Sequence, residues 1–227
     1  MKFYSFEGLD GCGKSTAMAS VAEMLRSDGY EVITTREPGG TPLGEAIRNY
    51  LLKDTSVAVC KHAEALLFAA SRTQLYNELI LPNKDNDIII LCDRFIDSSI
   101  AYQGIGYDLG ASNVIAINDF GINGFRPDKV FYLKVSAAER KKRLGATAPD
   151  KIESRDGDFF SLAEKGFEVA HTLYKMESDH SVASGITSQD RFVTIDGSNA
   201  PNVVASEIYQ YIKADRSIKV SNHFVTE

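Results

Sequence analysis

The chain has 227 residues, 44% of them apolar, which is enough to bury one core of ordinary size. Its net charge of −6 argues against a protein that coats nucleic acid, because neutralising phosphates needs a basic face. Three widely spaced cysteines suggest neither a disulfide framework nor a zinc site and indicate the cytoplasm, and no apolar stretch approaches the roughly 20 residues that cross a bilayer, so we expect no membrane partner.

Short β-rich runs alternate with longer helical patterns along the chain. The strands are expected at 2–7, 31–35, 88–92, 129–135 and 191–195. The helices are expected at 14–28, 42–53, 57–81, 112–122, 136–144, 159–180 and 200–213. This alternation predicts an α/β fold, a five-stranded parallel sheet flanked by helices. The run 88–91 is apolar without alternation, which is typical of a strand buried on both faces and places it inside the sheet.

The sequence contains no Pro/Gly/Ser-rich linker and no internal repeat, which favours a single domain over 1–214. Residues 145–158 are rich in charge and small side chains, and we interpret them as an exposed mobile loop between two helices. The weakly patterned segment 215–227 is expected to form a loosely held C-terminal tail.

The strongest motif is GLDGCGKS at 8–15, which matches the phosphate-loop pattern G-x-x-x-x-G-K-[ST] between the first strand and the first helix. Glycines let successive backbone N–H groups face phosphate oxygens, and the following helix adds its positive end. Lys14 would reach the β- and γ-phosphates of ATP, and the Ser15 hydroxyl would bind Mg²⁺. The competing interpretation is a glycine-rich turn that caps a helix. The predicted ATP-binding residues are Gly8, Leu9, Asp10, Gly11, Cys12, Gly13, Lys14, Ser15 and Thr16.

Asp93 and Arg94 directly follow the buried strand, at the end of a parallel sheet where ligands bind. The carboxylate of Asp93 suits the Mg²⁺ shell and the guanidinium of Arg94 suits a phosphate. An ordinary exposed ion pair at a strand end is the alternative. Cys12, inside the loop, is either a thiol activated by the helix N-terminus or a small side chain that the loop tolerates.

A phosphate loop alone does not separate kinases from other nucleotide-binding proteins. A GTPase would carry a guanine-selecting Asn-Lys-x-Asp string after a strand. The nearest string, at 83–85, lacks that spacing and precedes its strand. A GTPase is therefore disfavoured, and other motifs have to identify the function.

Four blocks of sequence resemble the thymidylate kinase family, bacterial type, over about 2–214. They are FEGLDGCGKST at 6–16, TREPGGTP at 35–42, DRF at 93–95 with SS at 98–99 and AYQG at 101–104, and RPD at 126–128. The resemblance implies a P-loop nucleoside monophosphate kinase fold with a mobile lid, and Mg-ATP-dependent phosphorylation of dTMP to dTDP for dTTP synthesis. It also implies a homodimer.

Phe68 and Arg72 are four residues apart on an expected helix and so share a face. An aromatic plane beside a forked donor suits a pyrimidine, although the spacing alone is equally compatible with a core phenylalanine and a solvated arginine. The resemblance implies that Phe68 stacks on thymine and that Arg72 donates to its O4. It adds Ser98, Ser99 and Gln103 to the acceptor site.

The resemblance also implies roles around the acceptor's sugar. It places Tyr102 against the deoxyribose, where it would exclude a 2′-hydroxyl, and Asp10 near the 3′-hydroxyl and phosphate. It makes Glu37, beside Pro38, the residue that positions the acceptor and the metal. The alternative interpretations without a function are a core side chain for Tyr102 and a rigid turn before a helix for 38–42.

Arg36, Arg48 and Arg94 are the candidates for gripping the dTMP phosphate, because guanidinium forks bind phosphate bidentately. Arg48 also fits an ordinary exposed helix position. The acceptor oxygen is already ionised at neutral pH, so no general base is expected.

The lid is predicted at 145–158. Bacterial-type relatives carry a glycine where Gly11 stands and supply catalytic arginines from the lid. This lid is poor in arginine, and the family's DRIE string appears as DKIE at 150–153. The contenders for the catalytic cation are Arg143, Lys151 and Arg155, and a solvated charged loop is the alternative.

Two other functions stay open from the sequence. One is a broader deoxynucleoside or UMP/CMP monophosphate kinase, which a panel of acceptors would distinguish. The other is a non-catalytic P-loop regulator, which would bind ATP without transferring phosphate.

Overall fold

The computed structural model describes residues 1–54, 56–145, 152, 157–180 and 191–221. Within these residues one parallel sheet has the strand order β2-β3-β1-β4-β5. Its strands are β1 (Lys2–Glu7), β2 (Val32–Arg36), β3 (Ile89–Asp93), β4 (Lys129–Lys134) and β5 (Phe192–Asp196). Each predicted strand is confirmed to within one residue at either end, and β3 lies inside the sheet as its unbroken apolar run indicated.

The register of the strands brings their carboxyl ends together. Asp93 at the end of β3 pairs with Phe6 of β1 on one side and with Arg36 of β2 on the other. The backbone N–H groups of Glu37 and Arg94 continue these ladders by donating to Asp93 O at 2.9 Å and to Phe6 O at 3.0 Å. Three loops therefore open side by side at one edge of the sheet, where open α/β sheets bind ligands.

Helices connect the strands. Those before β4 are α1 (Lys14–Ser27), α2 (Pro42–Arg48), η1 (Asn49–Lys53), α3 (Lys61–Leu75), η2 (Tyr76–Ile80), η3 (Leu81–Asn83), α4 (Ile96–Ser99), η4 (Ile100–Gly106) and α5 (Ala111–Ile122). Those after it are α6 (Ala137–Leu144), α7 (Gly157–His180) and α8 (Pro201–Ser221). The last helix continues past 214, where we expected a tail to begin. Among the described residues, none of the helices is both long and apolar enough to span a bilayer.

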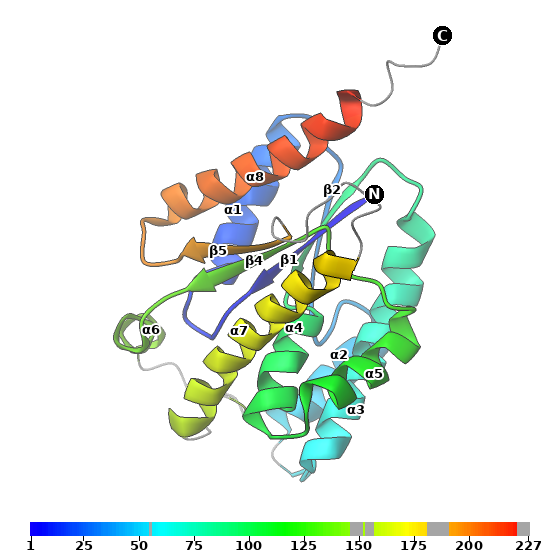
Figure 1. Cartoon of the computed structure of the whole chain (residues 1–227), viewed down its shortest axis with the longest axis vertical. Helices are drawn as coiled ribbons and strands as arrows, with labels where there is room; N and C mark the ends of the chain where they lie inside the picture. The colour runs from blue at the N-terminus through cyan, green and yellow to red at the C-terminus, as the bar shows by residue number, and fades with distance from the viewer. Residues whose placement is uncertain (55, 146–151, 153–156, 181–190, 222–227) are drawn as a thin grey trace.

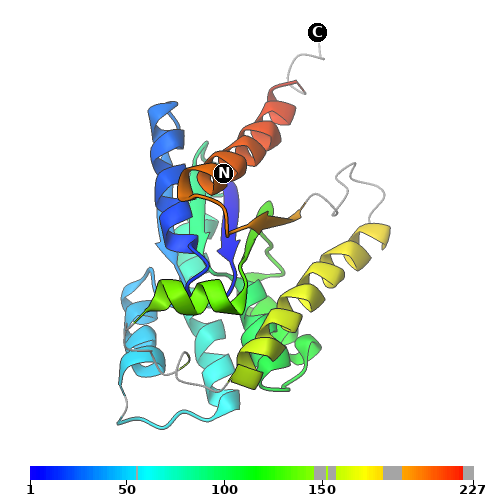
Figure 2. The same ribbon diagram turned by 90° about the vertical axis from the view of Figure 1, so that its left-hand side faces the viewer.

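The helices cover the sheet on both faces (Figure 1). α1 and α8 lie together on one face, and α3, α4, α5 and α7 lie on the other, as the turned view confirms (Figure 2). Side chains alternate along each strand, so Tyr4 and Phe6 of β1 pack toward α1 and α8 while Phe3 packs toward the opposite layer. Two apolar clusters separated by the sheet result.

The continuous helix formed by α4 and η4 was not predicted. Its sequence mixes Asp, Ser and Gly, which are weak helix formers. The structure supplies a tertiary reason for it: the buried carboxylate of Glu7 accepts a hydrogen bond from the backbone N–H of Phe95 at 2.7 Å and another from the hydroxyl of Ser98. The carboxyl group of Glu7 at the end of β1 thus fixes the first turn of this helix.

α7 and η4 approach each other at backbone distance. A Cβ built at Gly166 of α7 would lie 2.5 Å from the Cα of Ala101 in η4, closer than real Cβ contacts come. Only glycine permits this approach. The contact places η4, which carries Tyr102 and Gln103, firmly against the outer helix.

Candidate active site

The phosphate loop curves between β1 and α1. Gly8, Gly11 and Gly13 have φ angles of 136°, 80° and 98°, which favour glycine. The ammonium of Lys14 lies inside the curve, where it donates to Gly8 O at 2.9 Å and to Leu9 O at 3.3 Å. The loop therefore presents one buried cation at the place where phosphates would lie against its backbone.

α6 packs directly on this loop. A Cβ at Gly11 would lie 3.0 Å from the Leu144 side chain and 3.1 Å from the carbonyl of Arg140. Figure 2 shows α6 crossing the end of β1. The small residue that the sequence places at position 11 is thus required by the neighbouring helix, and α6 is held beside the loop.

Ser15 and Asp93 bring two oxygen ligands together. The Ser15 hydroxyl donates to Asp93 Oδ2 at 2.7 Å. Hard oxygen donors of this kind suit Mg²⁺. Among the described residues no group of three or more His, Cys, Asp or Glu could hold a metal. The pair fits an ion that takes its other ligands from phosphates and water, as Mg²⁺ commonly does.

Arg94 is fixed in place by the loop. Its guanidinium donates to Gly8 O and Ser98 Oγ, both at 3.0 Å, and to Asp10 Oδ1 at 2.6 Å. Its φ of 72° is a strained value for a residue with a side chain, a feature that concentrates at functional sites. Although burial opposes it, the charges of Arg94 and Lys14 lower the pKa of Asp10 to about 2, so this carboxylate stays ionised.

Glu37 and Arg72 form a buried ion pair. They are 3% and 1% exposed, and the carboxylate Oε2 lies 2.6 Å from Arg72 Nη2 and accepts from its Nε at 2.7 Å. Glu37 Oε1 is buried and has no hydrogen-bond partner among the described residues. Burial raises the pKa of Glu37 to about 7, against the pull of Arg72.

The remaining N–H groups of Arg72 are also engaged. They donate to Ser99 Oγ at 3.0 Å, to Phe95 O at 3.0 Å and to the side-chain oxygen of Asn118. With the bond from Nε to Glu37, the guanidinium makes four hydrogen bonds, and each of its three nitrogens has a partner. Asn118, on α5, was not predicted, because a single asparagine in a helical pattern gives no signal for a contact 46 residues away.

Phe68 lies one helical turn before Arg72 and is 9% exposed at the cavity wall. Tyr102 faces the same space from η4. Its hydroxyl is buried without a hydrogen-bond partner among the described residues, and the guanidinium of Arg94 lies 5.2 Å from its ring centre. Burial raises the pKa of Tyr102, so the hydroxyl keeps its proton.

Arg36 and Arg48 stand at the open side. Arg36 is 53% exposed and pairs bidentately with Glu45 at 3.0 Å. Arg48 donates to Pro38 O at 2.9 Å, across the cis peptide bond that joins Glu37 to Pro38. Arg48 of α2 therefore bonds the loop after β2, whereas Arg36 at the end of β2 bonds α2.

A single cavity of about 360 Å³ gathers these side chains. All the residues predicted to bind the acceptor line it: Asp10, Arg36, Glu37, Pro38, Arg48, Phe68, Arg72, Arg94, Ser98, Ser99, Tyr102 and Gln103. Gly11, Gly13, Lys14, Ser15, Thr16 and Asp93 line its other end. Leu52 and Ile152 also line the cavity, and no motif in the sequence predicted them.

Comparison with known proteins identifies the family. The family model described as thymidylate kinase matches residues 6–208. A thymidylate kinase of Finegoldia magna is 44% identical over 167 residues, which are 73% of this chain and 82% of that protein. One of Thermosipho africanus is 39% identical over 93% of this chain and 97% of its own length. The crystal structure of the Ehrlichia chaffeensis thymidylate kinase superimposes with a TM-score of 0.68 at 30% identity, covering 93% and 98% of the two chains.

The chain belongs to the thymidylate kinase family. It is therefore a nucleoside monophosphate kinase, a phosphotransferase, with the P-loop fold of that class. The resemblance seen in the sequence and the predicted fold class are confirmed.

A second cavity, of about 290 Å³, lies on the other side of the thymidylate kinase phosphate loop. Arg143 of α6 lines it and donates to Gly197 O at 2.8 Å, while its Nε bonds Glu139 at 3.0 Å. The other lining residues are Cys12, Gly13, Thr16, Ala17, Leu133, Gly197, Asn199, Pro201 and Val204. We did not predict that the loop from β5 to α8 lines this cavity, because no motif in its sequence indicates that it folds back to α1.

The candidates for the catalytic cation are not all placed. Arg143 lies at the second cavity rather than at the first. Lys151 and Arg155, with most of the predicted lid, lie outside the described residues. Arg140, which we did not consider, contributes to the low pKa of Asp10.

Proposed function

We propose that this kinase transfers the γ-phosphoryl group of ATP to dTMP, giving ADP and dTDP, in the cytoplasm. One observation carries the proposal: a single cavity has a phosphate end, lined by Lys14, Ser15 and Asp93, and a second part lined by Phe68 and Arg72. We call this second part the chamber. An acceptor whose base lies in the chamber would point its phosphate at the loop. Phosphoryl transfer depends mainly on such positioning and on charge neutralisation.

Phe68 would stack on the thymine ring, and Arg72 would donate to O4. Because each nitrogen of the Arg72 guanidinium already has a hydrogen-bond partner, this bond replaces one of the existing bonds. The bond to Ser99 is the best candidate, since Ser99 also lines the cavity and its hydroxyl is free to rotate toward the ligand.

Tyr102 would lie against the deoxyribose. Its hydroxyl, which is buried without a hydrogen-bond partner among the described residues, would gain one from the ligand. The ring leaves little room for a 2′-hydroxyl, which would favour deoxynucleotides over ribonucleotides.

Arg94, Arg36 and Arg48 would bind the acceptor phosphate. Arg94 is held ready by Asp10, whereas Arg36 has to leave Glu45, an exposed pair of little stability. Glu37 would help to position the acceptor and the ion. The attacking phosphate oxygen is already ionised, so no side chain has to remove a proton.

The backbone of the phosphate loop and Lys14 would hold the β- and γ-phosphates of ATP. Ser15 and Asp93 would hold Mg²⁺, which neutralises phosphate charge when it is bound. The second cavity adjoins the loop through Gly13 and Thr16 and would take the nucleoside part of ATP. Arg143, Lys151 and Arg155 stay our candidates for the cation that stabilises the transferred group.

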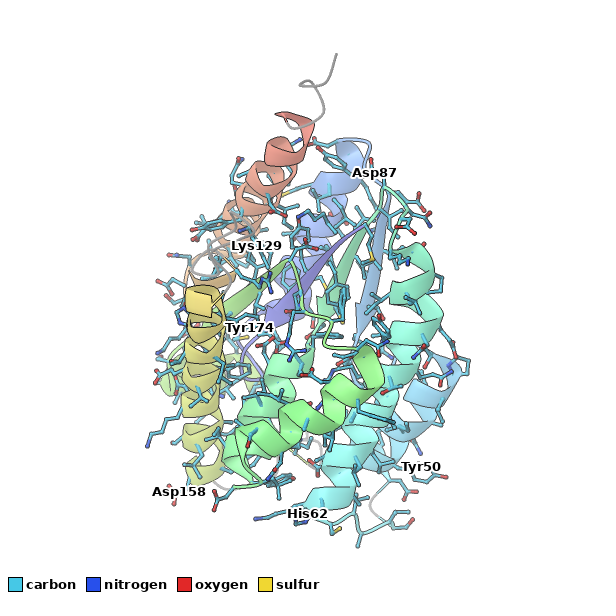
Figure 3. The ribbon with its side chains drawn as sticks, turned by 45° about the vertical axis from the view of Figure 1, so that its right-hand side comes forward. Tyr50, His62, Asp87, Lys129, Asp158 and Tyr174 are labelled. Atoms are coloured by element: carbon cyan, nitrogen blue, oxygen red, sulfur yellow. The ribbon has the colours of Figure 1, made fainter. Side chains whose placement is uncertain are left out.

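We also infer a homodimer. α3 and α5 lie side by side (Figure 3) and expose large apolar side chains: Leu66 on α3 is 56% exposed and Phe120 on α5 is 91% exposed. A second copy that covers this face would bury both. Phe120→Asp should convert a dimer into a monomer in light scattering after gel filtration, whereas Val203→Asp, at an exposed apolar position on α8, should not. A monomeric parent protein would contradict the inference.

The activity is tested by coupling ADP release to a dehydrogenase, with Mg-ATP and dTMP, dUMP, UMP, dCMP, dGMP or AMP. We expect fast turnover with dTMP, and Lys14→Ala should lower kcat by about 10²–10³ because one electrostatic donor to the transferred group is lost. Turnover with another monophosphate but not with dTMP would overturn the acceptor assignment. No turnover with any acceptor would leave only nucleotide binding.

A further inference from the structure

Glu64 is a buried carboxylate beside the chamber that no role above includes. It lies on α3 and is 4% exposed. Its Oε1 accepts a hydrogen bond from Gln103 Nε2 at 3.0 Å, and its Oε2 accepts one from the Tyr107 hydroxyl at 2.9 Å. Two hydrogen bonds thus fix a carboxyl group that does not itself line the cavity.

Two stripes of side chains face each other across the chamber. Glu64, Phe68 and Arg72 follow one another at four-residue spacing on α3, and Ser99 and Gln103 do so on the helix formed by α4 and η4. Arg72 bonds Ser99 at one end of the pair of stripes, and Glu64 bonds Gln103 at the other. Phe68 lies between these two cross-links.

An amide has two different faces, and Glu64 decides which of them the chamber meets. A carboxylate can only accept hydrogen bonds, so it requires the NH₂ group of Gln103 to point toward it. Gln103 is 2% exposed and lines the cavity. Its oxygen, an acceptor, is then the atom left for a ligand.

We propose that Glu64 is a positioning residue that makes the acceptor pocket selective for a pyrimidine with a proton on N3. The proposal rests on the assignment of dTMP as substrate. Thymine presents an N3–H donor, which the Gln103 oxygen accepts. Cytosine has no proton on N3, so its N3 lone pair would face a lone pair of the Gln103 oxygen and be repelled by it. Turning the amide to suit cytosine would set its oxygen against the accepting oxygen Oε1 of Glu64, so the loss of this hydrogen bond opposes the exchange.

The test compares dTMP with 5-methyl-dCMP, two acceptors that share the methyl group and the deoxyribose. In Glu64→Gln, the Tyr107 hydroxyl still donates to the new carboxamide oxygen at position 64. The NH₂ group of that carboxamide then faces Gln103, and the Gln103 amide turns so that its oxygen accepts from this NH₂ group. The chamber then meets an NH₂ group. We expect the ratio of kcat/KM for dTMP to that for 5-methyl-dCMP to fall about tenfold or more, the factor for one hydrogen bond replaced by a mismatch.

Glu78→Gln is the matched control, since Glu78 is an exposed glutamate on η2, the continuation of the same helix. It should leave the ratio unchanged. The exchange variant Glu64→Gln/Gln103→Glu restores a donor at 64 and an acceptor at 103, and it should recover the preference for dTMP.

Two results would overturn the proposal. One is an unchanged ratio in Glu64→Gln with a uniform loss for both acceptors, which would mark Glu64 as structural only. The other is an exchange variant that is folded, as judged by circular dichroism, but does not regain the preference for dTMP. If Glu64→Gln does not fold, the exchange variant alone tests the proposal. Failure of the parent enzyme to use dTMP would instead refute the proposed function.

Discussion

The two ends of the cavity are built differently, as two of its arginines show. Arg72, at the base end, is 1% exposed and holds partners from the Glu37 loop, α4 and α5. Arg36, at the phosphate end, is 53% exposed and holds one exposed glutamate. The end with Arg72 is thus buried and hydrogen-bonded as part of the core, whereas the end with Arg36 is exposed and has room for further partners from ligands. Loss of a side chain should damage folding at one end and catalysis at the other.

The largest effect should come from Arg72→Met. It leaves the carboxylate of Glu37 buried without its cation, so we expect the free energy of unfolding to fall by about 3–5 kcal/mol. Urea denaturation followed by circular dichroism measures this change. The double variant Arg72→Met/Glu37→Gln, which removes the charge left behind, should recover part of the loss. A loss below about 1 kcal/mol would show that the base end does not hold the fold.

Arg36→Ala should separate catalysis from stability. The lost fork to phosphate should lower kcat/KM for dTMP by roughly 10- to 100-fold, while the free energy of unfolding changes by less than about 1 kcal/mol, because the pair with Glu45 is exposed. Steady-state kinetics and urea denaturation on one preparation give both numbers. Arg36→Lys, which keeps the charge but loses the fork, should fall between. Equal damage to folding by Arg36→Ala and Arg72→Met would erase the contrast.

Glu37 should make stability depend on pH. Burial raises its pKa to about 7 from an ordinary value near 4.5, so the native state binds the proton more tightly than the unfolded chain does. Its contribution is fully present below the unfolded pKa and is lost as pH rises through about 7. Glu37→Gln should therefore show a shallower fall in the free energy of unfolding between about pH 5 and 7. Glu45→Gln, at a carboxyl of lowered pKa, should retain the parent slope. Parallel curves for Glu37→Gln and the parent would contradict the assignment.

Tyr102→Phe should have the smallest effect. The hydroxyl is buried without a partner among the described residues, so its removal should leave the free energy of unfolding within about 0.5 kcal/mol of the parent. The hydrogen bond that forms with the ligand is lost, and KM for dTMP should rise by about 2- to 10-fold. Thermal unfolding and kinetics measure the two. A clear loss of stability would mean that the hydroxyl already has a role in the free enzyme.

The sequence predicted well what depends on short spacing. The strands were predicted from apolar runs, because strands buried on both faces of a sheet consist of apolar residues. The phosphate loop was predicted from one contiguous motif. Phe68 and Arg72 were predicted from the family resemblance, because their four-residue spacing alone was equally compatible with a core phenylalanine and a solvated arginine. Glu64, four residues earlier on the same face, was not predicted, and its burial is unusual because glutamate is mostly exposed in proteins.

The sequence could not predict what depends on distant partners. The helix at α4 and η4 exists because Glu7 binds its first turn, and Asn118 reaches Arg72 across 46 residues. The residues of the second cavity after β5 are equally remote from the loop that they adjoin. Spacing along the chain carries no information about such contacts, although the resemblance to the family predicted residues that line one cavity.

The contact between Gly166 and Ala101 bears on drug resistance. A side chain at position 166 would force α7 away from η4, and η4 carries Tyr102 and Gln103 in the wall of the acceptor pocket. A mutation on the outer helix would then reshape the pocket while every residue that touches an inhibitor stayed the same. Resistance to an inhibitor that binds in this cavity can therefore arise at a residue that does not line it.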